Sequence, residues 1–467
     1  MRIVSFLIIF FAFATISLAE KVKIYGTAQS YARSNLNIKY HSEAFTYAEK
    51  KICDFPVNED GQFSVEFEIK KSRLVFLPLG IYKGFLYLEP GKEYELKLPL
   101  KKELSPAQKL NPFFEAEELM IGVANIDTNK LNLMIRKLDD KLDAFINQNF
   151  HKIYRKKDKS VGIDFANQIK EEFNAVQNQF FKDYLHYRLG FMEFLAYPNA
   201  FRKIEEKYFV GKEIQLNNPA YMSLYKKQYG NFLNGFFSQK ESPTISAAFK
   251  SKNTYQEIFA LMNKYPAYEN IQFRNLIIAT SIFDSYSRKF IGRKKALEIF
   301  TQIKKSSGHD YTKELCANFI AKITHLQKDY PAPNFSIGDH QLANYKGKYL
   351  YLNFCNTQSY PCLQDFKEIQ KLKQQFGQHI EFLSIACDWD ESRFEQFAKT
   401  NQYDWPIIHI GDQHQLIQQY NVKAFPIYVL IDPEGNIVDA TAPGPKENIQ
   451  MQFIKIARDA LRKAYQK

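Results

Sequence analysis

The chain has 467 residues, 45% of them hydrophobic, and a formal net charge of +12 from 63 Lys and Arg against 51 Asp and Glu. That length is too great for one ordinary domain and suggests about three. From Pro331 onward there are 14 basic and 15 acidic residues, so the excess of positive charge lies in the first 330 residues, with 49 basic against 36 acidic. The lysines there are interleaved with acidic residues, which favours a solvated surface and argues against nucleic acid as a partner.

Residues 1–19 have the pattern of a secretory signal peptide. Met1-Arg2 is a basic start, an apolar run follows to Ile16, and Ser17-Leu18-Ala19 is a small-x-small cleavage site. An uncleaved membrane anchor is the alternative, but the run is short for a span. We expect an exported protein of the periplasm or cell envelope, with no stable membrane span after signal removal.

Residues 20–103 are predicted to form an antiparallel β-sandwich or barrel. Phe63, Val65, Phe67 and Ile69 alternate with polar residues, which is typical of a half-buried strand. Asn58-Glu59-Asp60-Gly61 supplies turn residues between two strands. This domain contains no catalytic constellation, so we expect it to serve in docking or spacing.

Residues 104–329 are predicted to be all-α. Apolar residues recur at helical spacing, as in Leu131, Ile135, Leu138, Leu142 and Phe145. Aromatic stripes in this region could line a groove for partner peptides, although core packing is the favoured interpretation. Because Cys and His nowhere cluster at metal-ligand spacing, we predict no metal site and no cofactor.

Residues 330–467 alternate strands and helices, which predicts an α/β domain. An apolar run at Tyr349–Phe354 predicts a buried strand, the loop Cys355-Asn356-Thr357-Gln358-Ser359-Tyr360-Pro361-Cys362 follows, and a helix continues to about Gln375. The N–H groups at such a helix start stabilise a thiolate. Further strands are predicted at 381–386, 406–410, 427–431 and 436–440, and further helices at 391–400, 413–420 and from about 447.

This last domain resembles the thioredoxin fold, specifically the TlpA/ResA-like envelope thioredoxins. The marks, in order, are Ala332-Pro333-Asn334-Phe335, Lys346-Gly347-Lys348, Asn353-Phe354, Phe425-Pro426 and Asp432-Pro433-Glu434-Gly435. The resemblance implies a thiol–disulfide oxidoreductase that acts on protein or peptide clients. It further implies a cis bond before Pro426, and a peptide-binding surface formed by Pro426, Phe425, Tyr360 and Pro361. The β-domain is similar to one that often precedes TlpA-like domains.

One position departs from the family pattern. Where the family has Cys-x-x-Cys, this chain has Ser359-Tyr360-Pro361-Cys362, so Ser359 replaces the attacking cysteine. A serine cannot form a disulfide, so the ordinary dithiol cycle is absent at this pair. Peroxiredoxin chemistry also fits poorly, because Thr357 stands five residues before Cys362, whereas Thr-x-x-Cys would need a cysteine at Tyr360.

Three roles remain open for Cys362. It is an inert buried residue, a redox partner of Cys355 in a Cys-x6-Cys pair, or a monothiol that forms mixed disulfides with clients; Cys387 is a weaker candidate partner. Two functions therefore compete. One is an envelope oxidoreductase with a remodelled active site, and the other is a non-catalytic thioredoxin-fold protein that binds a client or an envelope partner.

Overall fold

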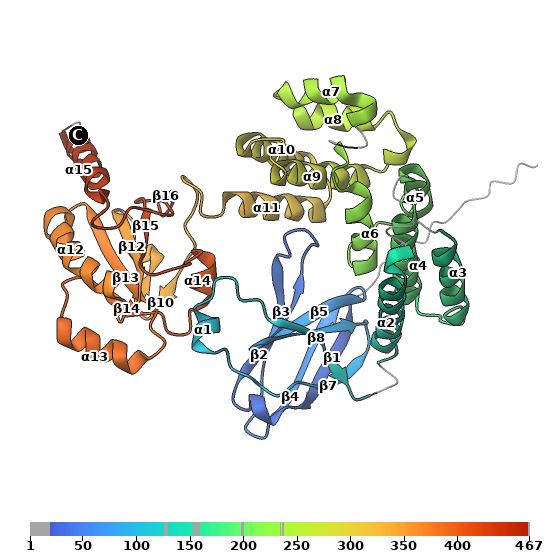
Figure 1. Cartoon of the computed structure of the whole chain (residues 1–467), viewed down its shortest axis with the longest axis horizontal. Coiled ribbons are helices and arrows are strands. Elements are labelled where there is room, and N and C mark those ends of the chain that lie inside the picture. The colour runs from blue at the N-terminus through green and yellow to red at the C-terminus, as the bar shows by residue number, and fades with distance from the viewer. Residues whose placement is uncertain are drawn as a thin grey trace, which may run out of the picture. The chain divides into compact units, whose positions relative to one another are not determined.

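The computed structural model describes residues 19–125, 129–152, 159–197, 200–233, 235 and 238–465 (Figure 1). It forms two compact units, one made of Met1–Lys102 with Glu117–Cys316 and the other of Glu103–Ala116 with Ala317–Lys467. The expected signal peptide, residues 1–19, lies outside the described residues except for Ala19. Across the described ranges, no helix combines the length and the apolar character that a membrane crossing needs.

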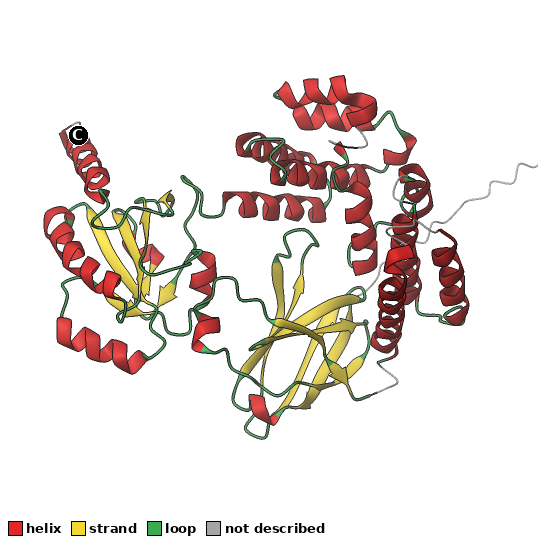
Figure 2. Cartoon of the chain, in the orientation of Figure 1, coloured by secondary structure: helices red, strands yellow, loops and turns green. Residues whose placement is uncertain are grey.

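The first unit begins with a β-sandwich (Figure 2). One sheet has the order β4-β1-β7-β9 and the other β3-β2-β5-β6-β8. The strands are β1 (Glu20–Thr27), β2 (Asn35–His41), β3 (Glu49–Pro56), β4 (Gln62–Ile69), β5 (Arg73–Leu79), β6 (Tyr82–Leu88), β7 (Glu93–Lys97), β8 (Glu117–Met120) and β9 (Gly122–Val123). Inward residues of both sheets, such as Ile24, Tyr94, Val75 and Leu86, share one buried core, which confirms the predicted sandwich.

Two strand pairs in the sandwich are parallel, β1 with β7 and β6 with β8. Strands β8 and β9 also correct a prediction, because they lie in a stretch that the sequence analysis assigned to helix. Residues 117–123 are too short to show an alternating pattern, and they become strands because the sheet edges offer backbone partners. Val123 pairs with Leu96 of β7, and Leu119 with Gly84 of β6.

The central helices of the first unit follow β9. They are α2 (Lys130–Phe150), α3 (Lys159–Glu172), α4 (Gln179–Ala196), α5 (Phe201–Tyr208), α6 (Pro219–Tyr229), α7 (Ser238–Lys250), α8 (Thr254–Met262), α9 (Ile271–Ser287), α10 (Arg293–Ser306) and α11 (Asp310–Thr324). The α2 stripe predicted from sequence is buried at Leu131, Ile135, Leu138 and Leu142. Buried aromatic rings dominate this region, as core packing requires.

The helices and the sandwich are joined by specific hydrogen bonds. The Asn132 amide of α2 accepts from the backbone N–H of Tyr87 in β6 at 2.8 Å and donates to its carbonyl at 3.0 Å. Tyr87 packs edge-on against Tyr184 of α4, with 6.1 Å between ring centroids. These bonds satisfy the backbone N–H and carbonyl of Tyr87, which are buried. They tie α2 to β6 and so help to join the sandwich and the helices into one unit.

The second unit is built on a five-stranded sheet of order β14-β13-β12-β15-β16. Strands β12, β13 and β14 are parallel to one another, while β15 and β16 are antiparallel to their neighbours. Apart from a short hairpin, β10 (Ser336–Ile337) with β11 (His340–Gln341), its elements are β12 (Tyr349–Cys355), α12 (Tyr360–Phe376), β13 (Ile380–Ala386), α13 (Glu391–Asn401), β14 (Ile407–His409), α14 (Gln415–Gln419), β15 (Ile427–Ile431), β16 (Ile437–Asp439) and α15 (Ile449–Tyr465).

Hydrophobic cores cover both faces of this sheet. Phe366 of α12 and Phe453 of α15 are fully buried on one face, and Leu416 and Ile417 of α14 on the other. The element order agrees with the sequence prediction, and β15 has the predicted bounds. The segment 103–116, with helix α1 (Pro106–Lys109), belongs to this unit; Leu110 packs on the α14 side of the core.

Candidate functional site

The candidate site lies where β12 ends and α12 begins. Cys355 is the last residue of β12, Ser359 is the N-cap of α12, and Pro361 occupies the first turn, where its missing N–H costs nothing. Cys362 lies one residue further on and is fully buried. The fold therefore brings Ser359 and Cys362 into the first turn of α12.

The Cys362 thiol is held in a largely apolar environment. The backbone N–H of Asn356 donates to its sulfur at 3.4 Å. Burial raises the pKa of Cys362 above its ordinary value, and this outweighs the lowering by the Asn356 N–H and the Ser359 hydroxyl; Asp365 raises it further. Although the thiol lies at a helix start, it is held as the neutral form, because burial penalises a thiolate more than these donors stabilise it.

Cys355 and Cys387 are fully buried thiols close to Cys362. Each S–H group donates to the carbonyl of Ile385, with 3.7 Å between sulfur and oxygen. Burial is the main reason that the pKa of each lies well above its ordinary value. Cys355 shares the α12 side of the core with Cys362, whereas Cys387 belongs to the other side. All of these cysteines are free thiols in the structure.

The bond between Phe425 and Pro426 is cis, which confirms that prediction. Pro426 and Pro361 line the same hollow, so the cis-proline loop lies beside the start of α12. The hollow has a volume of about 360 Å³ and is completed by Asp365, Ile427, Tyr428, Thr441, Ala442, Gly444, Lys446 and Glu447. Of the other two residues of the predicted peptide surface, Tyr360 projects into solvent with 70% of its surface exposed, whereas Phe425 is partly buried against both hydrophobic cores.

A polar group forms one wall of this hollow. The Tyr428 hydroxyl donates to Asp365 at 2.9 Å, and the Lys446 ammonium lies 3.6 Å from the other Asp365 oxygen. The ring of Tyr428 stacks on that of Tyr351, with 5.0 Å between centroids. Asp365 was not among the predicted site residues, although its position one helical turn after Cys362 indicates a side chain on the same side of α12.

A second carboxylate that the sequence analysis missed fixes the active-site loop. Asp388, 1% exposed, accepts from the Thr357 backbone N–H at 3.1 Å and from its hydroxyl at 2.7 Å. Thr357 thus bonds to Asp388 across 31 residues of sequence. Trp389 follows with 56% of its surface exposed, so the loop is flanked by two accessible aromatic side chains, Trp389 and Tyr360.

No group of three or more His, Cys, Asp or Glu side chains that could hold a metal ion occurs within the described ranges. The polar groups of the site are instead engaged with one another or with the backbone. The thiols and the proline-lined hollow are the features of this site that bear on its chemistry.

Comparisons with known proteins point to the same part of the chain. A family model described as the AhpC/TSA family matches residues 323–440. The thiol-disulfide oxidoreductase ResA of Geobacillus kaustophilus is 30% identical over 146 residues, which cover 30% of this chain and 83% of ResA. The thioredoxin-like protein YneN of Bacillus subtilis is 27% identical over 133 residues, covering 27% of this chain and 77% of YneN.

Among solved structures, the thioredoxin domain of a thiol-disulfide oxidoreductase from Bacteroides vulgatus matches with 20% identity and a TM-score of 0.26, covering 28% of this chain and 97% of that domain. The sheet order, the cis-proline beside the helix start and the ResA match agree. Through its C-terminal domain, the chain belongs to the ResA-like, thioredoxin-fold family of thiol-disulfide oxidoreductases.

Proposed function

We propose that this protein is an exported, non-catalytic member of the family that binds client polypeptides beside cis-Pro426 and does not turn over disulfides at Ser359 and Cys362. The observation that carries the proposal is the combination of an oxygen at the attacking position with a neutral, fully buried thiol beneath it. Export is supported by the sequence pattern of residues 1–19.

Disulfide exchange needs two sulfurs with different tasks. A thiolate attacks a client disulfide, forms a mixed disulfide and releases one client thiol, and a second thiol then resolves the bond. The Ser359 hydroxyl cannot form the mixed disulfide. Cys362 is fully buried and its pKa is raised, so it is a poor substitute as the attacking group.

Peroxide reduction, which the AhpC/TSA description suggests, is opposed by the same thiol. Oxidation by peroxide requires an accessible cysteine with thiolate character. Cys362 is 0% exposed, and the hydroxyl of Thr357 donates to Asp388. Neither residue is arranged to bind and activate a peroxide.

Binding is supported by what the site retains. The cis-Pro426 loop, Pro361 and the hollow beside them present backbone and apolar surface to an extended chain, and Tyr360 and Trp389 supply exposed aromatic contacts. The clients we propose are polypeptides that bear thiols or disulfides, or an envelope partner protein recognised in the same way.

Binding can be followed by the fluorescence of Trp389, since Trp405 is buried. An unfolded, thiol-blocked polypeptide is titrated into the full chain. Tyr360→Ala is expected to weaken binding about fivefold or more, as the loss of an aromatic anchor does. Phe290→Ala, which removes an exposed aromatic ring (62% against 70% for Tyr360) from the first unit, is the matched control. Absence of binding, or equal effects of the two variants, contradicts the proposed surface.

Mass-spectrometric mapping of cysteines tests the inactive site. After mild oxidation, we expect Cys355, Cys362 and Cys387 to remain free thiols, because all are buried in the structure. A bond between Cys355 and Cys362 that forms under oxidant and opens with a mild reductant would instead establish a remodelled redox pair, and the non-catalytic proposal would be wrong.

A further inference from the structure

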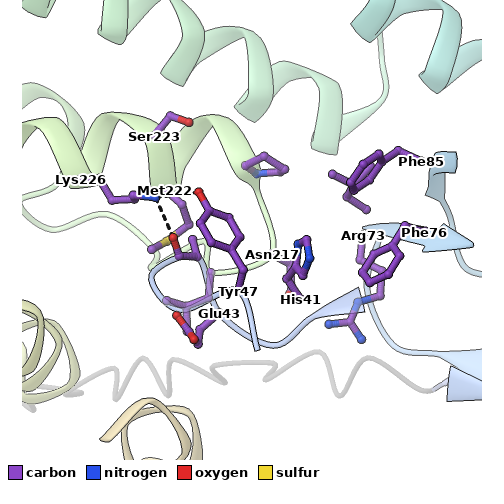
Figure 3. A pocket seen from close by; sticks show the side chains of 14 residues that line it. His41, Glu43, Tyr47, Arg73, Phe76, Phe85, Asn217, Met222, Ser223 and Lys226 are labelled. Atoms are coloured by element: carbon purple, nitrogen blue, oxygen red, sulfur yellow. Dashed lines mark hydrogen bonds between the residues drawn. The ribbon is translucent and has the colours of Figure 1, made fainter. Parts of the chain in front are cut away.

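A second cavity lies in the first unit, between the β-sandwich and helix α6 (Figure 3). Its volume is about 170 Å³. The sandwich contributes His41 at the end of β2, Glu43 and Tyr47 of the loop that follows, and residues of β5 and β6, among them Arg73, Phe76 and Phe85. Helix α6 contributes Met222, Ser223 and Lys226. Every lining residue belongs to the same compact unit.

Two cations line this cavity without a matching anion. The Lys226 ammonium donates to the carbonyl of Ala44 at 2.7 Å and to the Tyr47 hydroxyl at 3.0 Å, and no carboxylate among the described residues reaches ion-pair distance. The Arg73 Nε–H is buried, and it has no hydrogen-bond partner in the part of the chain that the structure describes. A partly buried cation without a counter-ion is unfavourable unless a ligand supplies the negative charge.

The carboxylates close to these cations are already engaged. Glu43, 4% exposed, accepts from the backbone N–H groups of Phe45 and Thr46 and from the Thr46 hydroxyl. Glu314, whose charge acts on Arg73, is paired with Lys50 at 2.7 Å. Glu314 thus offsets part of the charge of Arg73, whereas among the described residues no carboxylate reaches ion-pair distance of Lys226, so the positive charge of Lys226 remains available to an anion.

His41 adds a neutral donor to the two cations. Burial, and then the charge of Lys83, lowers the pKa of His41, so the ring is neutral near pH 7. Its Nε2 lies 3.0 Å from the Lys83 ammonium and must accept from it, which leaves the ring proton on Nδ1. The described residues supply no acceptor to that proton.

The remaining walls are apolar and aromatic. The His41 ring lies 4.8 Å from that of Phe76 and 5.3 Å from that of Tyr47, measured between centroids. Leu74, Leu216 and Met222 complete the apolar lining. A cavity of about 150 Å³ lined in this way accommodates a single benzene ring, so one ring with a short acidic substituent fits the space.

We propose that this cavity is a binding site for a small apolar monocarboxylate, with Lys226 as the cation that binds the carboxylate, Arg73 and the Nδ1–H of His41 as further donors in the lining, and Phe76, Phe85 and Met222 as the apolar contacts of its body. The site is independent of the thiols of the second unit, so it stands or falls separately from the function proposed above. No bond is made or broken there; the proposal is for binding alone.

Phenylacetate is the probe, with its neutral analogue 2-phenylethanol as the chemical control, titrated calorimetrically into the full chain. We expect phenylacetate to bind at least about tenfold more tightly than 2-phenylethanol, because hydrogen bonds to charged groups contribute about 1.5–3 kcal/mol. Lys226→Met should weaken phenylacetate binding by a similar factor. Lys227→Met, which removes the same charge from the exposed neighbouring position of α6, should leave it unchanged.

Location is read from the methyl NMR signal of Met222, assigned with Met222→Leu. A ring bound in the cavity shifts this signal, so the site remains testable even if Lys226→Met fails to fold. No binding, equal binding of the alcohol, equal effects of the two lysine variants, or an unshifted Met222 signal would each overturn the proposal.

The carboxylate can come from a free acid or from the C-terminus of a polypeptide. N-acetyl-Gly-Phe with a free carboxylate, compared with its amide and with phenylacetate, separates the two sources. Tighter binding by the dipeptide acid supports a polypeptide C-terminus, and tighter binding by phenylacetate supports a free acid. Equal binding of the dipeptide acid and its amide contradicts recognition of a carboxylate.

Discussion

At the scale of single residues, the proposed function depends on the Ser359 hydroxyl and the Cys362 thiol. Ser359 keeps the geometry of a helix N-cap but carries oxygen where exchange chemistry needs sulfur. Beneath it, Cys362 accepts a hydrogen bond from Asn356, and burial keeps it protonated. The N–H groups at the start of α12 would favour a thiolate, but burial of the Cys362 sulfur favours the neutral thiol more strongly.

The pH dependence of Cys362 alkylation follows from this environment. Because burial raises the pKa of Cys362 above its ordinary value of 9.0, its reaction rate with iodoacetamide should still be rising at that pH. Quantitative mass spectrometry of the Cys362 peptide measures the rate. Ser359→Ala removes a hydroxyl that lowers this pKa and should move the curve to higher pH. A rate that levels off below pH 9.0 would show that Cys362 is an activated thiol.

At the scale of elements, sequence patterns predict the second unit well. Its strands are short apolar runs and its helices have one apolar face, so β12, β13 and β15 begin and end within a residue of prediction, and α12 ends within a residue of it. The cis bond at Pro426 was predicted by resemblance. By contrast, β8 and β9 form because neighbouring strand edges are free to pair, and a seven-residue stretch carries no periodic signal for that.

The missed parts of the candidate site have a related cause. Asp388 bonds to Thr357 across 31 residues, and Lys226 bonds to Ala44 across 182. Neither pair has a spacing or a motif from which the contact could be recognised in a single sequence. Local patterns give elements and their order, whereas side-chain partners between distant elements depend on how those elements pack.

Helix α5 carries a buried carboxylate whose ionisation should oppose folding. Glu205 accepts from Tyr268 at 2.8 Å and from Arg202 at 2.7 Å, yet burial outweighs these bonds and raises its pKa above 4.5. The folded chain therefore binds this proton more tightly than the unfolded chain, so stability falls as pH rises from 4.5 through the folded pKa.

Urea unfolding between about pH 4 and pH 7 tests this sign. Glu205→Gln cannot ionise and should lose less stability across that range than the wild-type chain. Glu206→Gln, the exposed neighbour, is the matched control and should follow the wild type. A steeper loss in Glu205→Gln would mean that the ion pair with Arg202 lowers the pKa of Glu205 instead.

At the scale of the whole molecule, the chain consists of two compact units with separate cores, and it passes between them at residues 102–103, 116–117 and 316–317. The first unit contains the carboxylate cavity, and the second contains the thiols and the cis-proline groove. The proposed carboxylate binding is therefore assigned to the first unit, and the proposed client binding and the thiols to the second.

Calorimetry should show two unfolding transitions, because each unit buries its own core. Phe453→Ala removes a fully buried ring from the second unit, costs about 3–5 kcal/mol, and should lower one transition. Leu86→Ala acts on the sandwich, costs about 2–5 kcal/mol, and should lower the other. Phenylacetate should raise only the transition that Leu86→Ala lowers. A single transition shifted by both variants would contradict the separation.

Thiol-dependent reduction of insulin disulfides tests the central claim most directly. The wild-type chain should reduce insulin no faster than the reductant alone, while Ser359→Cys should catalyse the reaction, because the introduced thiol attacks the client disulfide and Cys362 resolves the mixed disulfide. Wild-type turnover above the reductant background would show that the non-catalytic account is wrong: turnover that is lost in Cys355→Ala would assign it to a Cys355–Cys362 pair, and turnover that persists in Cys355→Ala would assign it to Cys362 without Cys355.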